Sequence, residues 1–175
     1  QRSLGYVERL KPRRTFLTHI CHDLGHARAE SLRDLWRLEE FARVSLIPTL
    51  VLRLAPLVGE RSPFWLRLRS RPLLRAMGRT VVMPVLEEDA VRAVERALRE
   101  SRPSEGWYEL TGPDARSLAE WAEIASVHGH PEPDGAGAWE PELEELAEHR
   151  LSEPEIWQER FAMAAHSVVN WAGKR

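Results

Sequence analysis

The stretch "TVVMPVLEEDAVRAVERALRESRPSEGWYELTGPD", residues 80–114, has the pattern of a strand, a helix and a second strand. The apolar run at 80–83 ends before Pro84, and "WYEL" at 107–110 ends at the turn "TGPD". Runs this short are typical of buried strands. Residues 87–100 predict a helix whose first turn is acidic, where the helix dipole favours negative charge. Its expected apolar stripe consists of Ala90, Val91, Val94, Ala97 and Leu98.

The same alternation continues through the rest of the chain. Further strands are predicted over "TFLTHIC" (15–21) and "TLVLRL" (49–54), and further helices over 30–44, 117–127 and 141–151. A capping box opens the 117–127 helix, with Ser117 and Glu120, and another opens a last helix. One side of this last helix is expected to hold Ile156, Trp157, Phe161, Ala164 and Val168. Strands that alternate with helices indicate an α/β fold with a largely parallel sheet. Only about four strands are visible, fewer than a doubly wound sheet usually has.

The composition is that of one folded domain. The chain has 175 residues, of which 43% are hydrophobic and 30% charged, so wholesale disorder is excluded. No apolar run reaches the roughly 18–20 residues of a transmembrane helix, and no secretory signal is visible. The single cysteine excludes an internal disulfide. It also fits a reducing cytoplasm, which is where we expect the protein.

Charge is divided unevenly along the chain. Residues 1–80 carry 16 Lys/Arg and 7 Asp/Glu, whereas residues 81–175 carry 9 and 20. We expect the two halves to neutralise each other within one fold, and consider a nucleic-acid partner unlikely. The basic stretch at 61–79 also suggests a membrane-surface segment, but Pro63 and Pro72 break it into short pieces.

Polar side chains crowd the segment "FLTHICHDLGHARAE", residues 16–30. The adjacent His22 and Asp23 suggest a metal site like that of HD phosphohydrolases, because imidazole and carboxylate are good ligands for Zn, Fe or Mn. However, the residues before this pair predict a strand, whereas an HD pair is presented by a helix. The alternative is that His22, Asp23 and His26 line the loop after a strand. In open α/β sheets that rim is where ligands bind, so we assign no metal ligand.

Two stretches resemble a known family. Residues 81–126, with the "EDAVRAV" helix and the "ELTGP" turn, are similar to the later part of extended and atypical short-chain dehydrogenase/reductase proteins. These include the NAD-dependent epimerase/dehydratase and NmrA-like groups. Residues 30–61 resemble the family's segment from the active-site helix to the next strand, with Arg53, Pro56 and Gly59 in matching places.

The resemblance implies a partial Rossmann-like sheet that holds NAD or NADP. Residues 1–129 would be the later half of the dinucleotide-binding domain, and residues 130–175 an acidic helical segment. Cofactor contacts are expected at the ends of the first two strands, and a substrate contact at His26 and Trp36; the cofactor positions are Cys21, Arg53, Ala55, Pro56 and Leu57. Arg53 could instead pair with a glutamate, and Trp36 could be a packing residue.

The chain departs from the family at two functional elements. It contains no G-x-G-x-x-G, the loop whose backbone N–H groups approach the cofactor pyrophosphate. The helix over 30–44 has no Tyr and no Lys, the residues of the family's catalytic pair. His22 with Asp23 is the expected substitute as acid or base.

The sequence therefore favours an atypical, catalytically weakened dehydrogenase/epimerase-like NAD(P)-binding fragment that acts on or senses a small molecule or nucleotide. One alternative is a non-enzymatic structural or regulatory subunit that completes its sheet with a partner chain or by self-association. The second is an HD-type metal-dependent phosphohydrolase.

Overall fold

The computed structural model describes six parts of the chain, which are residues 14–19, 30–44, 48–69, 79–99, 105–127 and 155–174. The helices are α2 (Glu30–Arg43), α3 (Pro63–Leu68), α4 (Glu87–Arg99), α5 (Leu118–Val127), α7 (Ile156–Phe161) and α8 (Val168–Ala172). The strands are β1 (Arg14–His19), β2 (Thr49–Leu54), β3 (Leu57–Val58), β4 (Val81–Val82), β5 (Val85–Leu86), β6 (Gly106–Leu110) and β7 (Arg116–Ser117).

A three-stranded parallel sheet forms the centre of the fold, in the order β1-β2-β6. The central strand β2 is almost wholly apolar, because a parallel strand is covered by helices on both faces. Leu50, Val51 and Leu52 are at most 2% exposed. The register pairs Leu54 with both His19 and Leu110, so the carboxyl ends of the three strands lie level. The predicted α/β class and parallel sheet are confirmed.

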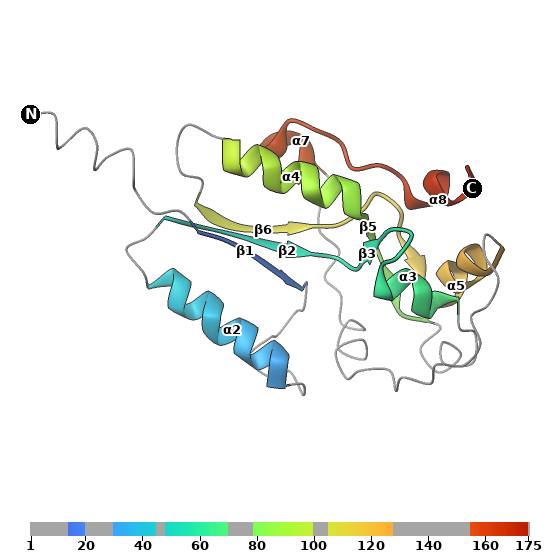
Figure 1. Cartoon of the computed structure of the whole chain (residues 1–175), viewed down its shortest axis with the longest axis horizontal. Helices are drawn as coiled ribbons and strands as arrows, with labels where there is room; N and C mark the ends of the chain where they lie inside the picture. The colour runs from blue at the N-terminus through green and yellow to red at the C-terminus, as the bar shows by residue number, and fades with distance from the viewer. Residues whose placement is uncertain are drawn as a thin grey trace, which may run out of the picture.

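Helices cover both faces of this sheet (Figure 1). On one face, α4 and α7 pack on a sheet cluster that includes Leu50, Leu52, Leu54, Ala90, Ala93, Ala97, Trp157 and Phe161. On the other face lies α2, whose buried Glu39 bonds Arg53 of β2. Successive residues of a strand point to opposite faces, which is why Arg53 meets α2 while its neighbours Leu52 and Leu54 meet α4.

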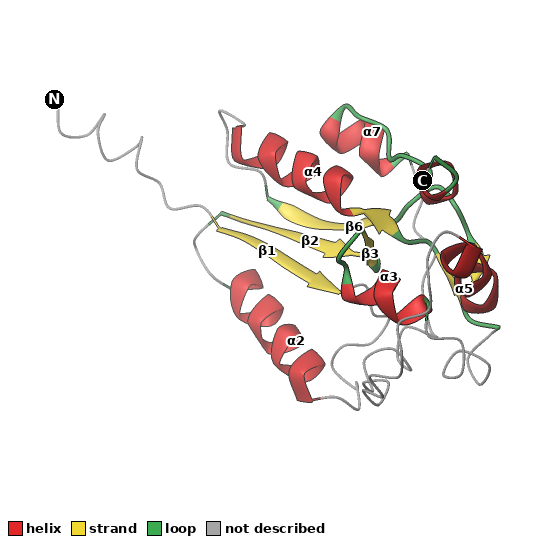
Figure 2. Cartoon of the chain, turned by 45° about the vertical axis from the view of Figure 1, so that its right-hand side comes forward, coloured by secondary structure: helices red, strands yellow, loops and turns green. Residues whose placement is uncertain are grey.

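Beyond the carboxyl ends of the strands lies a second group of elements (Figure 2). Here β3 pairs with β5 in parallel and β4 pairs with β7 antiparallel. Helices α3, α5 and α8 enclose an end cluster that includes Val58, Trp65, Leu68, Leu86, Trp121 and Val168. The buried indole of Trp121 donates to the Val82 carbonyl, 3.1 Å away. The acidic helix predicted over 141–151 lies outside the described residues.

The structure corrects three details of the sequence prediction. Val91 and Leu98 of the expected α4 stripe are 57% and 60% exposed, and Ala93 is buried in their place. The sheet thus receives a face of alanines, whose small side chains let the helix approach closely. The strand predicted over 80–83 is shorter, with only Val81–Val82 in β4, and a second strand that was not predicted, β5 (Val85–Leu86), follows Pro84.

The predicted last helix is two short helices. After Phe161 the chain turns at Ala162, whose φ of 48° is left-handed and ends α7. Residues up to Ser167 are not helical, and Ala164, expected on the buried side, is exposed. Val168 is buried, but it belongs to α8 and to the end cluster.

Candidate ligand-binding site

The loop after β2 leads directly from the sheet to a pocket. The Ala55 N–H donates to the Leu110 carbonyl at 3.0 Å, and the Pro56 carbonyl accepts from the Val85 N–H at 3.0 Å. These bonds fix the chain as it passes from β2 to β3. Ala55 and Pro56 are buried and Leu57 is half-buried, so the three predicted cofactor positions lie together at the carboxyl end of β2.

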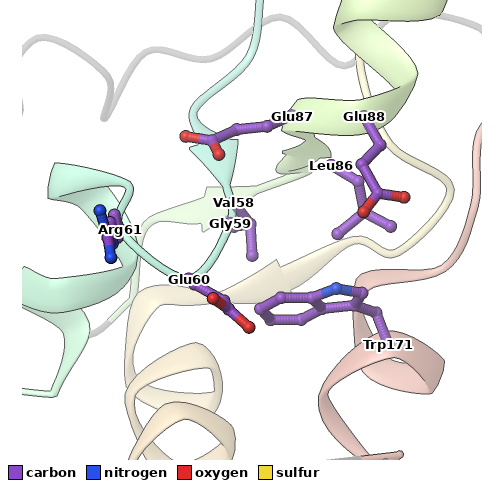
Figure 3. Close-up of a pocket in the computed structure, with 8 residues that line it drawn as sticks. All are labelled: Val58, Gly59, Glu60, Arg61, Leu86, Glu87, Glu88 and Trp171. Atoms are coloured by element: carbon purple, nitrogen blue, oxygen red, sulfur yellow. The ribbon is translucent and has the colours of Figure 1, made fainter.

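The pocket, of about 410 Å³, lies at the far end of β3 (Figure 3). Its lining comes from three segments that are distant in the sequence. The turn after β3, the junction of β5 with α4, and helix α8 contribute Val58, Gly59, Glu60, Arg61, Leu86, Glu87, Glu88 and Trp171. Parallel pairing of β3 with β5 places the first two segments side by side.

The turn at one wall is held by Ser62. Its Oγ accepts from the Gly59 N–H and from the Trp65 N–H, each at 3.2 Å, so the same hydroxyl closes the turn and caps α3. The Glu87 carboxylate lies close to the turn, since a Cβ at residue 59 would be 2.1 Å from its Oε2 and would displace the end of that side chain. This close approach brings the Glu87 carboxylate over the turn that carries Glu60 and Arg61.

Trp171 forms the opposite wall. Its ring packs edge-on against Trp65, with centroids 5.6 Å apart and planes at 77°. Figure 3 shows the indole below Val58 and Leu86, with the Glu60 side chain beside it. The lining therefore combines an aromatic ring and two aliphatic side chains with three carboxylates and one guanidinium.

This combination sets what the pocket can accept. Carboxylate oxygens accept hydrogen bonds from hydroxyl or ammonium groups, while an indole and aliphatic walls pack against the apolar face of a ring. Three carboxylates facing one volume disfavour a phosphate group. Among the described residues, no group of three or more His, Cys, Asp or Glu side chains is arranged to hold a metal ion.

Arg53 of β2 is held in an ion-pair network with Glu39 of α2 and Glu109 of β6. Its guanidinium bonds Glu39 through Nε at 3.3 Å and Nη2 at 2.6 Å, and Glu109 through Nη1 at 3.3 Å. Burial lowers the pKa of Arg53, but hydrogen bonds and charges from Glu39 and Glu109 outweigh it, so the pKa is raised. The structure thus contains the glutamate pairing that the sequence offered as an alternative to a cofactor contact, and the cofactor contact itself stays a prediction.

The other predicted site residues are distributed unevenly. Cys21, His22, Asp23 and His26 lie outside the described residues, so the proposed acid–base pair stays a prediction. Trp36 is on α2, is 41% exposed and is not among the residues that line the pocket. The membrane-surface stretch is described only up to Arg69 and from Arg79. No helix of the described residues is both long and apolar enough to span a bilayer.

Sequence reasoning missed most of the pocket. The signal at Glu87 and Glu88 was present, but an acidic first turn has a sufficient explanation in the helix dipole. Trp171 was one of seven tryptophans and had an equally sufficient explanation in packing. Only the pairing of β3 with β5 brings these residues to Glu60, and two-residue strands leave no pattern in a sequence.

Comparison with known proteins gives a likeness of fold. No family model and no curated protein matches the sequence. A nucleoside-diphosphate-sugar epimerase from Staphylococcus aureus matches at a TM-score of 0.63 and 15% identity, over 98% of this chain and 68% of that one. The enzyme WbmH of Bordetella bronchiseptica, in complex with NAD+, matches at 0.62 and 15%, over 97% and 62%. WbmG of the same organism, in complex with NAD and UDP, matches at 0.59 and 18%, over 94% and 58%.

The chain therefore spans less than two thirds of the length of most of these structures, while nearly all of it is matched. The likeness confirms the Rossmann-type α/β fold that the sequence motifs indicated. At such low identity it extends to the fold alone.

Proposed function

We propose that this chain is the later, substrate-side part of an atypical NAD(P)-binding protein of the epimerase type, with weakened catalysis. One observation carries the proposal. The carboxyl ends of three parallel strands lie level, and the Ala55–Pro56 loop after the central strand leads into a pocket. The fold in which this occurs is shared with a nucleoside-diphosphate-sugar epimerase structure. In open α/β sheets this edge is where ligands bind.

The cofactor would be NAD or NADP, as in neighbours crystallised with NAD. Ala55, Pro56 and Leu57, with Cys21, which follows β1 in the sequence, would contribute one edge of its site. The glycine-rich loop that receives a pyrophosphate is missing from the 175 residues. We therefore expect this chain alone to bind dinucleotide weakly.

The ligand of the pocket would be an uncharged or amino-bearing hydroxylated ring. Glu60, Glu87 and Glu88 would accept hydrogen bonds from its hydroxyl or amino groups, and the Trp171 indole would pack on its face. This suits the sugar portion of a nucleotide sugar better than its diphosphate.

Catalysis is proposed to be weak because the usual acid–base pair is missing. Helix α2 contains neither Tyr nor Lys, and its buried positions include Glu39, paired with Arg53, and Ala42. His22 with Asp23 remains the candidate acid or base. A full reaction would also need a bound dinucleotide as hydride carrier.

A structural or regulatory subunit is the second candidate. Strand β1 ends the sheet on one side among the described residues, and an unpaired edge is a template for another strand. Near it, Leu38 and Phe41 of α2 are 49% and 62% exposed, and Val44, just after the helix, is 78% exposed. A segment or partner chain that supplies further parallel strands and a helix would cover both. The fold does not favour an HD-type hydrolase, because that class has a helical body, whereas the described residues include a three-stranded parallel sheet.

The two candidates separate in one experiment. The chain is expressed alone and together with the reading frame upstream of Gln1, and each protein is tested for NAD binding and for turnover of a panel of nucleotide sugars. A weak enzyme gives NAD binding and slow turnover only in the longer protein, and the turnover is reduced by His22→Ala but not by His128→Ala. A longer protein that binds NAD without any turnover supports the regulatory role, and one that does neither contradicts the epimerase-type role.

A further inference from the structure

The segment Glu155–Lys174 connects the two hydrophobic clusters. Trp157, Phe161 and Met163 pack in the sheet cluster, whereas Val168 and Ala172 pack in the end cluster. Trp171, between these last two, lines the pocket. The position of its ring therefore depends on how the chain passes from α7 to α8.

One polar anchor holds this passage at Asp89. The carboxylate is in the first turn of α4 and is fully buried. Its Oδ2 accepts the His166 N–H at 2.6 Å, its Oδ1 lies 2.8 Å from His166 Nδ1, and Arg92 pairs with the same Oδ1. Asp89 follows directly after Glu87 and Glu88, yet it does not line the pocket.

Two further anchors flank the first. Arg96 Nη1 donates to the Phe161 carbonyl and, at 2.8 Å, to the Ala162 carbonyl, which fixes the left-handed turn that ends α7. Asp114 Oδ2 accepts from Ser167 Oγ at 2.8 Å and from the Val169 N–H at 3.2 Å, at the start of α8. His166 lies between these two points. Among the described residues, its backbone is hydrogen-bonded only to Asp89.

We infer that Asp89 is a positioning residue for the pocket: by holding the backbone and ring of His166, it fixes the turn that carries Trp171 into the pocket wall. The carboxylate that faces His166 and the two glutamates that face the pocket belong to one helical turn. Two of the three acids of the pocket, Glu87 and Glu88, and the aromatic wall opposite them are therefore set by the same element, whatever ligand the pocket takes.

The inference is tested with protein labelled with 5-fluorotryptophan. We expect separate fluorine signals from the seven indoles, and Trp171→Phe, Trp121→Phe and Trp157→Phe identify the three that the test uses. Asp89→Asn keeps the shape of the side chain but removes its charge and places an amide donor among donors. We expect the Trp171 signal to shift and to become more sensitive to solvent, while the signals of the buried Trp121 and Trp157 stay in place.

The matched control is Asp34→Asn. Asp34 pairs with Arg37 three residues on, as Asp89 does with Arg92, but it is exposed and lies on α2. It should leave the Trp171 signal unchanged. If Asp89→Asn disturbs all the signals, the test uses His166→Ala instead, because the His166 side chain is exposed. This variant should shift the Trp171 signal alone, and by a smaller amount. The inference is overturned if Asp89→Asn leaves both the Trp171 and the Trp121 signals in place. It is also overturned if the Trp171 signal does not respond to His166→Ala.

Discussion

Arg53 shows how a single side chain ties three elements together. From the middle of the sheet it bonds Glu39 on α2 and Glu109 on β6, and Glu39 is only 1% exposed. A buried charge that loses its partner is costly, because its desolvation is no longer compensated. The network therefore helps to hold α2 on the sheet at the level of the predicted active-site helix.

Replacing Glu39 with glutamine should test that role. We expect the free energy of unfolding to fall by about 2–3 kcal/mol, less than for an isolated buried pair because Arg53 keeps Glu109. Urea denaturation followed by circular dichroism gives the value. The control is Glu40→Gln, which removes the more exposed pair with Arg43 and should change stability by about 0.5 kcal/mol or less. Equal losses in the two variants would show that the Glu39 pair contributes no more than a surface pair.

Two glycines should respond differently to the same added methyl group. At Gly112 a Cβ would lie 1.9 Å from the Pro84 carbonyl oxygen, and the Gly112 N–H also bonds Met83. Since backbone must move, Gly112→Ala should cost about 2–3 kcal/mol of stability. At Gly59 the clash is with the flexible end of Glu87, so Gly59→Ala should cost less than about 1 kcal/mol and act mainly on the pocket. Thermal unfolding of both variants compares them, and a costlier Gly59→Ala would contradict this assignment.

At the scale of single helices, a sequence signal was reliable where the residues that contact each other lie within a few positions along the chain. The capping box predicted at Ser117 is present: the Glu120 carboxylate accepts from the Ser117 N–H at 2.8 Å and from its Oγ at 2.7 Å, and α5 runs from Leu118 to Val127. These bonds lower the pKa of Glu120 from its ordinary value of 4.5.

This shift gives a pH dependence to the start of α5. Because the folded pKa lies below the unfolded one, the stabilisation is fully present above about pH 4.5 and is lost as the pH falls through the folded pKa. We expect the Ser117 amide to lose its protection from hydrogen exchange in that acid range. Glu120→Gln should remove the pH dependence, whereas Glu123→Gln should retain it. An unchanged acid profile in Glu120→Gln would show that another group is responsible.

Helix orientation was less predictable than helix existence. In α4, apolar residues lie on more than one face, so periodicity alone allowed a stripe through Val91 and Leu98. The choice of the alanine face is made by the sheet, which the sequence does not describe. Likewise, Ala162 gives no local sign of a left-handed turn; the Arg96 and Asp89 bonds that hold the passage from α7 to α8 come from 65 or more residues earlier in the chain.

For the whole molecule, strand β2 was predictable because a strand buried on both faces is a short, continuous apolar run. Strand β6, which is mostly half-buried, was predictable because its short run ends at the turn "TGPD". The pocket was not, because its residues come from three segments brought together by tertiary pairing. The sequence resemblance indicated the fold that structural comparison then confirmed, although no family model matches.

Our central proposal is that this polypeptide carries one edge of a dinucleotide site but not the loop that binds the pyrophosphate. Its most direct test is calorimetric titration of the purified chain with NADH and with NADPH. Dissociation constants no tighter than the millimolar range, about 4 kcal/mol of binding free energy, are the expected result. Saturable binding at micromolar concentration by the chain alone would contradict the claim.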